Sequence, residues 1–431
     1  MTPAGRRAAR IAGLAAGSLM LSACVMGGGG TTKASDGKVS GKITFQTWNL
    51  KNDKFTAYFN GLIASFEKAH PGTDIKWVDQ PAEGYQDKLS ADAAAGSLPD
   101  VVDMGPEAAY TLAKAGVLLD LNKADPKAKG RYADKAWEAM TFKGLDGGTY
   151  GYPWYLNTGP SFFNKALFTK CGLNPGKLPA TYDELFDQAE TMAEKCSDTM
   201  MIARMPAIET FGEYGVPLMD ARGTKFSYNN AKGVEYVERF RKLYAKKGIG
   251  EEALNNLQTK EVEEFKAGRL AYLPGSSYTL DDLKTTAPDV YKNLGIGPRI
   301  SNSAPNMYLE SLVVNAATKN QSLATAFATY VTNSANQLTF AKKASVFPSS
   351  AGTLDDAYFT KDDGSPATKV RRESAAQVRK AAVWWPPAFS GAADSQTLRE
   401  QIAQALLGKK SVKAALDASV RYSNERLKAD K

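Results

Sequence analysis

The segment Ile43-Thr44-Phe45-Gln46-Thr47 alternates apolar with polar side chains, as a half-buried β-strand does, and runs directly into Trp48-Asn49. Apolar side chains then recur at helical spacing at Phe55, Phe59, Leu62, Ile63 and Phe66. His70-Pro71-Gly72 is a helix-terminating signal, and Asp74-Ile75-Lys76-Trp77-Val78 is typical of a second strand. This part of the chain is therefore predicted to form a strand, a helix and a further strand.

The same alternation continues outward from this unit. A helix is expected over 85–95 before Gly96, then the short strand Pro99-Asp100-Val101-Val102-Asp103-Met104, then a helix over 108–115 before Gly116. Strands that alternate with helices indicate a mostly parallel sheet covered on both faces, so we predict an α/β fold.

The second half of the sequence has a similar pattern. Thr181 is a candidate N-cap and Glu184 completes a capping box for a helix over 182–195. Residues 265–273 lead into a strand, and further helices are expected around 234–243, over 322–340, and over 397–407 and 411–427 on either side of Gly408. The sequence has no tandem repeat and no internal segment apolar enough to span a membrane.

The first 23 residues resemble a bacterial lipoprotein signal. Arg6, Arg7 and Arg10 precede an apolar segment over 11–21, and Leu21-Ser22-Ala23-Cys24 follows. In lipoproteins of this kind the cysteine receives a lipid anchor, so Cys24 is expected to carry diacylglycerol and palmitate and to begin the mature chain. Residues 24–40, rich in Gly, Ser and Thr, are expected to form a flexible tether. The alternative is an ordinary cleaved secretory leader, and the export route, Sec or twin-arginine, stays open.

Composition indicates a two-domain protein. The chain has 431 residues, 43% of them hydrophobic, and about 390 remain after leader and tether are set aside, enough for two cores. The formal charge of +8 falls to +5 without the three leader arginines. The densest basic cluster, over 369–380, lacks interleaved aromatic residues, so we interpret it as a solvated helical face and expect no nucleic-acid partner.

With Cys24 assigned to the anchor, Cys171 and Cys196 remain as a pair. Each lies near the end of an expected helix, and an exported protein permits a disulfide between them. Two free buried thiols are the alternative. A Cα separation well beyond about 7 Å would exclude the bond.

Ordered motifs along the chain resemble the extracellular solute-binding proteins of ATP-binding-cassette (ABC) sugar importers, the group that includes maltose- and oligosaccharide-binding proteins. The motifs are the strand ending at Trp48, Phe66-Glu67-Lys68-Ala69-His70-Pro71-Gly72, Leu98-Pro99-Asp100-Val101-Val102, Tyr150-Gly151-Tyr152-Pro153-Trp154-Tyr155, Phe163-Asn164-Lys165-Ala166-Leu167-Phe168, Phe265-Lys266-Ala267-Gly268-Arg269-Leu270-Ala271 and Leu407-Gly408-Lys409-Lys410-Ser411-Val412-Lys413-Ala414-Ala415-Leu416.

The resemblance implies a two-lobed periplasmic-binding-protein-like fold, in which each lobe is a mostly parallel sheet flanked by helices. The N-lobe would comprise 41–156 with 299–350, and the C-lobe 157–298 with 351–431. Hinge crossovers would lie near 155–159, 295–301 and 347–353. The ligand would occupy the cleft at the carboxyl ends of the strands, where open α/β sheets generally bind ligands.

A sugar site needs aromatic rings for the flat C–H faces of the ligand and carboxylates or amides for its hydroxyls. Trp77 and Trp137 fall inside a strand and a helix and are expected in the core. The candidate contacts, several placed only by the resemblance, are Trp48, Asn49, Asp53, Glu107, Trp154, Tyr155, Tyr278, Tyr308, Glu310, Trp384 and Trp385.

Several candidates also have ordinary structural explanations. Glu107 could simply stabilise a helix N-terminus, Trp154 and Tyr155 could pack in the core, and Trp384-Trp385 could form a hydrophobic plug. Relatives often carry tryptophan at the position of Tyr278.

The sequence gives little support for an enzyme. It has one histidine, His70, in the expected helix-ending turn, and no phosphate-binding loop, dinucleotide motif, CxxC pair or EF-hand, so no cofactor and no metal site is predicted. An exported glycoside hydrolase remains a rival because it needs only two suitably placed carboxylates, for which Glu107 and Glu310 are the test pair.

The sequence therefore predicts a monomeric receptor, lipid-anchored on the extracellular face of the cell membrane. It would close on a carbohydrate, in particular an oligosaccharide, and deliver it to ABC permease subunits served by a separate ATPase. A binding protein for a non-sugar solute is the remaining alternative.

Overall fold

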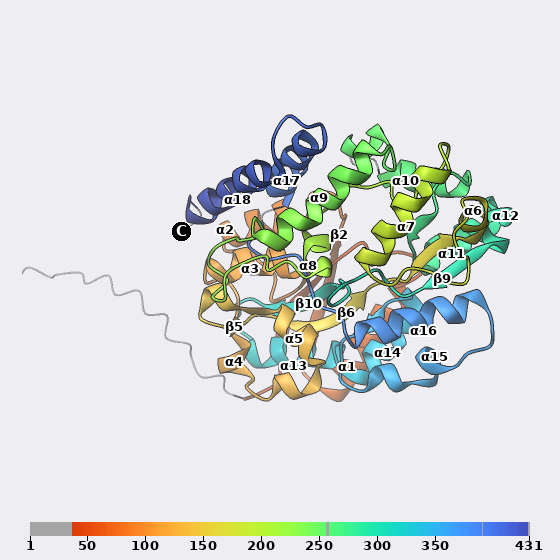
Figure 1. The fold of residues 1–431 in the computed structure, drawn as a ribbon. Helices are drawn as coiled ribbons and strands as arrows, with labels where there is room; N and C mark the ends of the chain where they lie inside the picture. Colours follow the sequence, from red (N-terminus) through yellow and green to blue (C-terminus); the bar gives the residue numbers. More distant parts are fainter. Residues whose placement is uncertain (1–36, 256–257, 390, 430–431) are drawn as a thin grey trace, which may run out of the picture. The chain divides into compact units, whose positions relative to one another are not determined.

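The structure, a computed structural model, describes residues 37–255, 258–389 and 391–429 (Figure 1). The expected leader, the lipidation site Cys24 and most of the tether lie outside these residues. Within the described ranges, no helix is both long enough and apolar enough to cross a membrane.

One sheet has six strands and mixed directions. β1 pairs in parallel with β2 and β3, whereas β10 pairs antiparallel with β3 and β6, and β11 antiparallel with β6. Its strands, in spatial order, are β11 (Phe347–Pro348), β6 (Tyr152–Asn157), β10 (Tyr308–Val314), β3 (Val101–Met104), β1 (Gly41–Trp48) and β2 (Thr73–Gln80).

A second sheet has three strands in the order β8 (Tyr272–Pro274), β7 (Ser161–Asn164) and β9 (Leu294–Gly297), and β7 is antiparallel to both neighbours. A short hairpin is formed by β4 (Thr141–Phe142) and β5 (Gly148–Thr149). The predicted α/β class with two sheets is confirmed. Fewer strand pairs are parallel than expected. The chain leaves the first sheet through β6 and enters the second through β7, and it returns through β9 and β10. The outgoing and returning strands therefore run in opposite directions.

Helices cover both faces of the six-stranded sheet. Neighbouring residues of β3, Val101 and Val102, lie in two different hydrophobic clusters, as alternate faces of a strand require. The helices that surround this sheet are α1 (Thr56–Ala69), α2 (Tyr85–Ala94), α3 (Pro106–Lys114), α4 (Leu121–Ala124), α5 (Asp134–Ala139), α13 (Gln321–Val331), α14 (Ser334–Ala344), α15 (Ala357–Thr360) and part of α16 (Pro366–Val378), with 3-10 turns η1 (Ala128–Arg131), η2 (Lys143–Leu145) and η4 (Thr353–Asp355).

The three-stranded sheet is also covered on both faces, with Phe162 and Phe163 of β7 in separate clusters. In Figure 1, α17 and α18 lie beside α9, a contact that brings the last helices of the chain onto this second core. The helices of this core are α6 (Lys165–Lys170), α7 (Tyr182–Lys195), α8 (Ile208–Tyr214), α9 (Ala231–Ala245), α10 (Gln258–Lys266), α11 (Ser277–Thr286), α12 (Pro288–Lys292), α17 (Gly391–Leu406) and α18 (Val412–Ala429), with 3-10 turn η3 (Glu251–Asn255).

Local signals in the sequence were accurate for many elements. The capping box of Thr181 and Glu184 begins α7, and His70 terminates α1. Trp77 and Trp137 are buried in the core, as predicted. The single helix expected over 322–340 is wrong: Asn333 caps a new helix, so α13 and α14 are separate.

Three connections between the two cores meet at Asn306, which is 1% exposed. Its backbone N–H donates to the Glu213 carboxylate at 2.9 Å, and its carbonyl accepts from the Thr158 hydroxyl at 3.0 Å. Its side-chain oxygen accepts from the backbone N–H of Trp384 at 3.0 Å. Asn306 therefore ties together the outgoing segment after β6, the returning segment before β10 and a third segment near Trp384.

This third connection lies later in the sequence than the expected 347–353. Leu354, Phe359 and Val378 are buried in the core of the six-stranded sheet, whereas Val370 of α16 packs with the three-stranded sheet. The chain passes fully to the second core only after Val383, since Trp384 is the next residue to pack against that core. The reason is that α16 lies between the two cores and contributes one buried surface to each.

The basic cluster of α16 is engaged in surface interactions. Arg372 pairs with Asp362, Arg379 pairs with Asp355 at 2.7 Å, and the Arg371 guanidinium lies 4.2 Å from the centre of the Tyr358 ring. This arrangement agrees with a solvated helical face.

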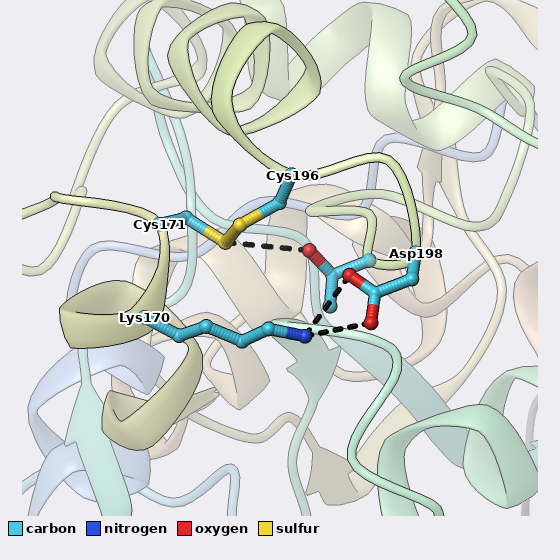
Figure 2. The surroundings of a disulfide bond; sticks show 5 residues. Lys170, Cys171, Cys196 and Asp198 are labelled. Atoms are coloured by element: carbon cyan, nitrogen blue, oxygen red, sulfur yellow. Dashed lines mark hydrogen bonds and ion pairs between the residues drawn. A yellow bond between two sulfur atoms is a disulfide. The ribbon is translucent and has the colours of Figure 1, made fainter.

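Cys171 and Cys196 are joined in the structure, with Sγ atoms 2.10 Å apart and Cα atoms 5.7 Å apart, within the range for a disulfide (Figure 2). Lys170 makes an ion pair with Asp198 beside them, with an N–O distance of 2.7 Å. The bond connects the residue after α6 with the residue after α7, so two helix ends are held together.

Candidate ligand-binding site

A cavity of about 300 Å³ opens where β1 and β3 end and where the antiparallel β10 begins. This volume is at the lower end of the range for small-molecule sites. We call it the strand-end cavity. It is lined by Trp48, Ala82, Tyr85, Gln86, Leu89, Met104, Gly105, Pro106, Glu107, Ala108, Tyr308, Leu309, Glu310, Val383 and Trp385.

Two further cavities, of about 320 and 620 Å³, adjoin it. Trp385 lines both the strand-end cavity and the first neighbour, and Glu107 lines both the strand-end cavity and the second. One side of this hollow is formed by α2 and α3, and the other includes Leu218, Pro387 and Leu427 from the second core. The hollow therefore runs between the two cores.

The local backbone explains how Trp48 and Glu107 reach the cavity. Trp48 is the last residue of β1, and β3 is followed by Gly105 at the N-cap and Pro106 at the first position of α3. This short turn places Glu107 in the first helical turn, where an acidic side chain is favourable. Both side chains thus lie at the carboxyl edge of parallel strands.

Glu310 and Asp103 form a buried acidic pair. In the register of β10 against β3, Leu312 is opposite Asp103, so Glu310, two residues earlier, points to the same face as Asp103. Asp103 is 0% exposed. Burial, together with the charge of Glu310, raises the pKa of Asp103 well above its usual value, and burial likewise raises the pKa of Glu310. Two adjoining buried carboxyls cannot both ionise readily, so the pair holds a proton between them at neutral pH.

Glu107 has a similarly unusual environment. Burial, and then the nearby Glu209 carboxylate of α8, raise the pKa of Glu107 to about 7, although a hydrogen bond with Gln86 lowers it in part. In the described part of the chain, no group of three or more His, Cys, Asp or Glu side chains is arranged to hold a metal ion.

Aromatic side chains surround these carboxyl groups. Tyr308, at the start of β10, is 51% exposed, and the rings of Trp48 and Tyr85 have centres 6.3 Å apart. Trp385 also lines the cavity. Rings beside carboxyls suit a ligand that has both flat apolar faces and hydrogen-bond donors.

Hydrogen bonds hold Trp384 and Trp385 in place. The indole N–H of Trp384 donates to the Ala304 carbonyl at 2.7 Å, and that of Trp385 donates to the Phe389 carbonyl at 3.1 Å. Trp384 lines the first neighbouring cavity, beside Trp385. Both rings border the hollow and also pack against the core of the three-stranded sheet, so the aromatic wall and the hydrophobic plug both stay predictions.

The sequence profile of bacterial extracellular solute-binding proteins matches residues 61–367 of this chain. The chain belongs to this family. The family is extracellular or periplasmic, which places this solute-binding protein outside the cytoplasm.

Among similar proteins, the galactooligosaccharide-binding protein of Bacillus subtilis (strain 168) is 25% identical over 448 residues, with 96% of each chain covered. The diacetylchitobiose binding protein DasA of Streptomyces coelicolor is 25% identical over 337 residues, covering 74% of this chain and 76% of the relative. The structure of the cyclic alpha-maltosyl-1,6-maltose binding protein from Arthrobacter globiformis shares the fold, with a TM-score of 0.69, 19% identity and coverage of 90% and 100%.

Two residues expected to contact a ligand lie elsewhere in this solute-binding protein. Trp154 is 0% exposed in the core, where its ring stacks on Phe340 with centres 5.1 Å apart. Tyr155 packs against the same two rings and, though it lies near Asp103 and Glu310, is not part of the cavity lining. Trp154 therefore has the core-packing role that was the alternative for it.

Asn49, Asp53 and Tyr278 are exposed and line none of the three cavities. Asn49 has a φ of 55°, which turns the chain away from the sheet edge directly after Trp48. The Asp79 carboxylate accepts hydrogen bonds from the next two backbone N–H groups and fixes this turn. Tyr278, 83% exposed, lies at the start of α11.

Sequence reasoning missed Tyr85, Gln86 and Asp103. Tyr85 and Gln86 begin α2, which the sequence predicted without indicating which face of the helix would meet the cavity. Asp103 carried a usable signal, because an acid inside the apolar strand Val101–Met104 is costly to bury without a purpose.

Proposed function

We propose that this solute-binding protein captures a carbohydrate, in particular an oligosaccharide, and delivers it unaltered to ABC permease subunits served by a separate ATPase. The observation that carries this proposal is the strand-end cavity, where Trp48, Tyr308 and Trp385 surround the carboxyls of Glu107 and Glu310. The two relatives named above bind galactooligosaccharide and diacetylchitobiose, which supports the same class of ligand.

Binding would involve hinge closure between two lobes. One lobe would be built on the six-stranded sheet and the other on the three-stranded sheet, with 157–161, 298–307 and 382–386 as connections. Because the hollow is lined from both cores, a ligand can contact both walls at once only when they approach. Such a ligand would favour the closed state by its additional contacts there.

The protein would act as a monomer, anchored to the outer face of the membrane by the lipid on Cys24. A disulfide between Cys171 and Cys196 suits such an oxidising location. Membrane fractionation tests the anchor, since a Cys24→Ser variant should leave the membrane fraction while the unaltered protein stays in it.

A glycoside hydrolase is the second candidate, because Glu107 and Glu310 line one cavity and a hydrolase needs two carboxyl groups. The family and its relatives are binding proteins, which favours capture without cleavage.

Thermal unfolding of the purified protein against a panel of mono- and oligosaccharides, amino acids and peptides tests the proposal. A sugar at about 100 times its dissociation constant should stabilise the fold by roughly 2.7 kcal/mol. Chromatography of the recovered sugar should show it intact. Cleaved sugar would favour the hydrolase, and a response to peptides or amino acids alone would overturn the carbohydrate assignment.

A further inference from the structure

In the part of the chain that the structure describes, the acidic side chains at the strand-end cavity make no ion pair with a cationic side chain. Glu107 and Glu310 line the cavity, and the fully buried Asp103 lies against Glu310. Within the described residues, the side-chain hydrogen bonds of Asp103 and Glu310 are to each other and, for Glu310, to Trp48, and none of them comes from a cation. The lining given above contains no Lys, Arg or His side chain.

The groups around this cluster do not neutralise it. Asp79 of β2 adds negative charge near Asp103, and Glu209 of α8 adds negative charge near Glu107. Tyr85 and Tyr155, beside the Asp103–Glu310 pair, are neutral phenols because their pKa values are raised further by burial. Arg204 and Arg299 act on Glu209 and make ion pairs with Glu261 and Glu213.

Buried carboxylates in folded proteins are normally paired with a cation, because an unpaired buried charge is costly. The proton held by the Asp103–Glu310 pair removes only part of this charge, and the cavity lining offers no cationic side chain for the rest, so a cationic ligand group would complete the pairing. We propose that the strand-end cavity recognises a saccharide that carries a protonated amine, with the amine between the carboxyls of Glu107 and Glu310. This inference rests on the proposed function and narrows its ligand to amino sugars.

The side chains of the neighbouring cavities indicate how the ligand would be oriented. Lys143 lines the first and Lys114 lines the second, so basic side chains occur in the hollow but outside the strand-end cavity. The amino group would enter the strand-end cavity, and neutral sugar units would extend into the wider hollow past Trp385.

Isothermal titration calorimetry on the purified full-length protein tests this with matched pairs in which an amine replaces the hydroxyl at C2 of each sugar unit. The pairs are glucosamine with glucose, galactosamine with galactose, and the β-1,4-linked glucosamine disaccharide with cellobiose. In at least one pair, the amino sugar should bind at least tenfold more tightly at pH 7.

The Glu310→Gln variant keeps the shape of the side chain and removes its charge, so the preference for the amine should disappear. Asp53→Asn is the matched control, because Asp53 is exposed and lines none of the cavities; this variant should keep the preference. If the Glu310→Gln variant does not fold, the Glu107→Gln variant, altered in α3, replaces it. It should likewise lose the preference for the amine.

Proton release gives an independent result. A bound cation favours full ionisation of the Asp103–Glu310 pair, which then releases the proton it holds. Titrations in buffers of different ionisation enthalpy should therefore show proton release with the amino sugar and none with its neutral partner.

Equal affinity within all pairs would overturn the amine inference, and the carbohydrate proposal would stand if neutral sugars bind. Binding of none of the six sugars would also overturn the inference. The wider panel then decides the proposed function: a response to a longer neutral oligosaccharide would retain it, and a response to peptides alone would not.

Discussion

At the scale of single residues, the protein combines favourable aromatic contacts with carboxyl groups that are held in an unfavourable environment. Asp103, Glu107 and Glu310 are less acidic than free carboxyls because burial disfavours their charged forms. When ionised, such groups destabilise the fold, and their retention in a cavity is typical of functional sites.

Glu107 gives this idea a measurable consequence. Its pKa rises from 4.5 in a free side chain to about 7, so the folded state binds a proton more tightly than the unfolded state. Stability from this group is complete below pH 4.5 and falls as pH rises to about 7, by up to roughly 3 kcal/mol. The free energy of unfolding in urea should be measured from pH 4.5 to 8. It should fall less steeply with pH in the Glu107→Gln variant than in the unaltered protein, and at pH 8 the variant should be the more stable of the two.

Asp53→Asn is again the control and should follow the unaltered protein, because Asp53 is exposed. Parallel pH profiles for the unaltered protein and Glu107→Gln would contradict the raised pKa of Glu107.

At this scale, several residues that the sequence predicted as ligand contacts line a common cavity. Trp48, Glu107, Tyr308, Glu310 and Trp385 were predicted and all line one cavity. Trp154 was misplaced because an aromatic residue beside a crossing satisfies core packing and ligand stacking equally well in sequence. Asp103 was missed because only the pairing of β10 with β3 reveals that it lies against Glu310.

At the scale of elements, helix α8 is fitted closely against the third connection. A Cβ atom built on Gly212 would lie 2.5 Å from two ring atoms of Trp384, whose indole is fixed to the Ala304 carbonyl. The ring cannot move without losing this hydrogen bond. The glycine is therefore required by packing between the second core and the wall of the hollow.

Gly212→Ala should destabilise the protein by about 1–3 kcal/mol, the usual cost of overpacking, as measured by the midpoint of urea unfolding. Gly61→Ala is the matched control: Gly61 is also helical, and a Cβ there would have no neighbour within 4 Å. That variant should be unchanged or slightly more stable. A Gly212→Ala protein as stable as the control would mean that Trp384 is free to move.

Helices and strands were predicted well wherever local chemistry determines them, as for the capping box of Thr181 and Glu184. The direction of the strands was not predicted correctly, because it depends on how many times the chain passes between the two sheets. The position of α16 between the two cores could not be predicted either. The pattern of its apolar residues does not show that Val370 and Val378 pack in different cores.

At the scale of the whole described body, the three connections that meet at Asn306 are the proposed hinge. Small-angle X-ray scattering should show a smaller radius of gyration when a sugar that shifts thermal unfolding is present at saturation. A sugar from the panel that gives no thermal shift serves as the control. An unchanged radius with the bound sugar would contradict closure.

The six tryptophans fall into two groups, and this division gives the protein an intrinsic optical signal. Trp77, Trp137 and Trp154 are buried in the core, whereas Trp48, Trp384 and Trp385 line the cavities. Ligand that displaces water from the second group would shift its fluorescence emission to shorter wavelength, while the core group supplies a constant background. Ligand capture can therefore be followed in real time without a label.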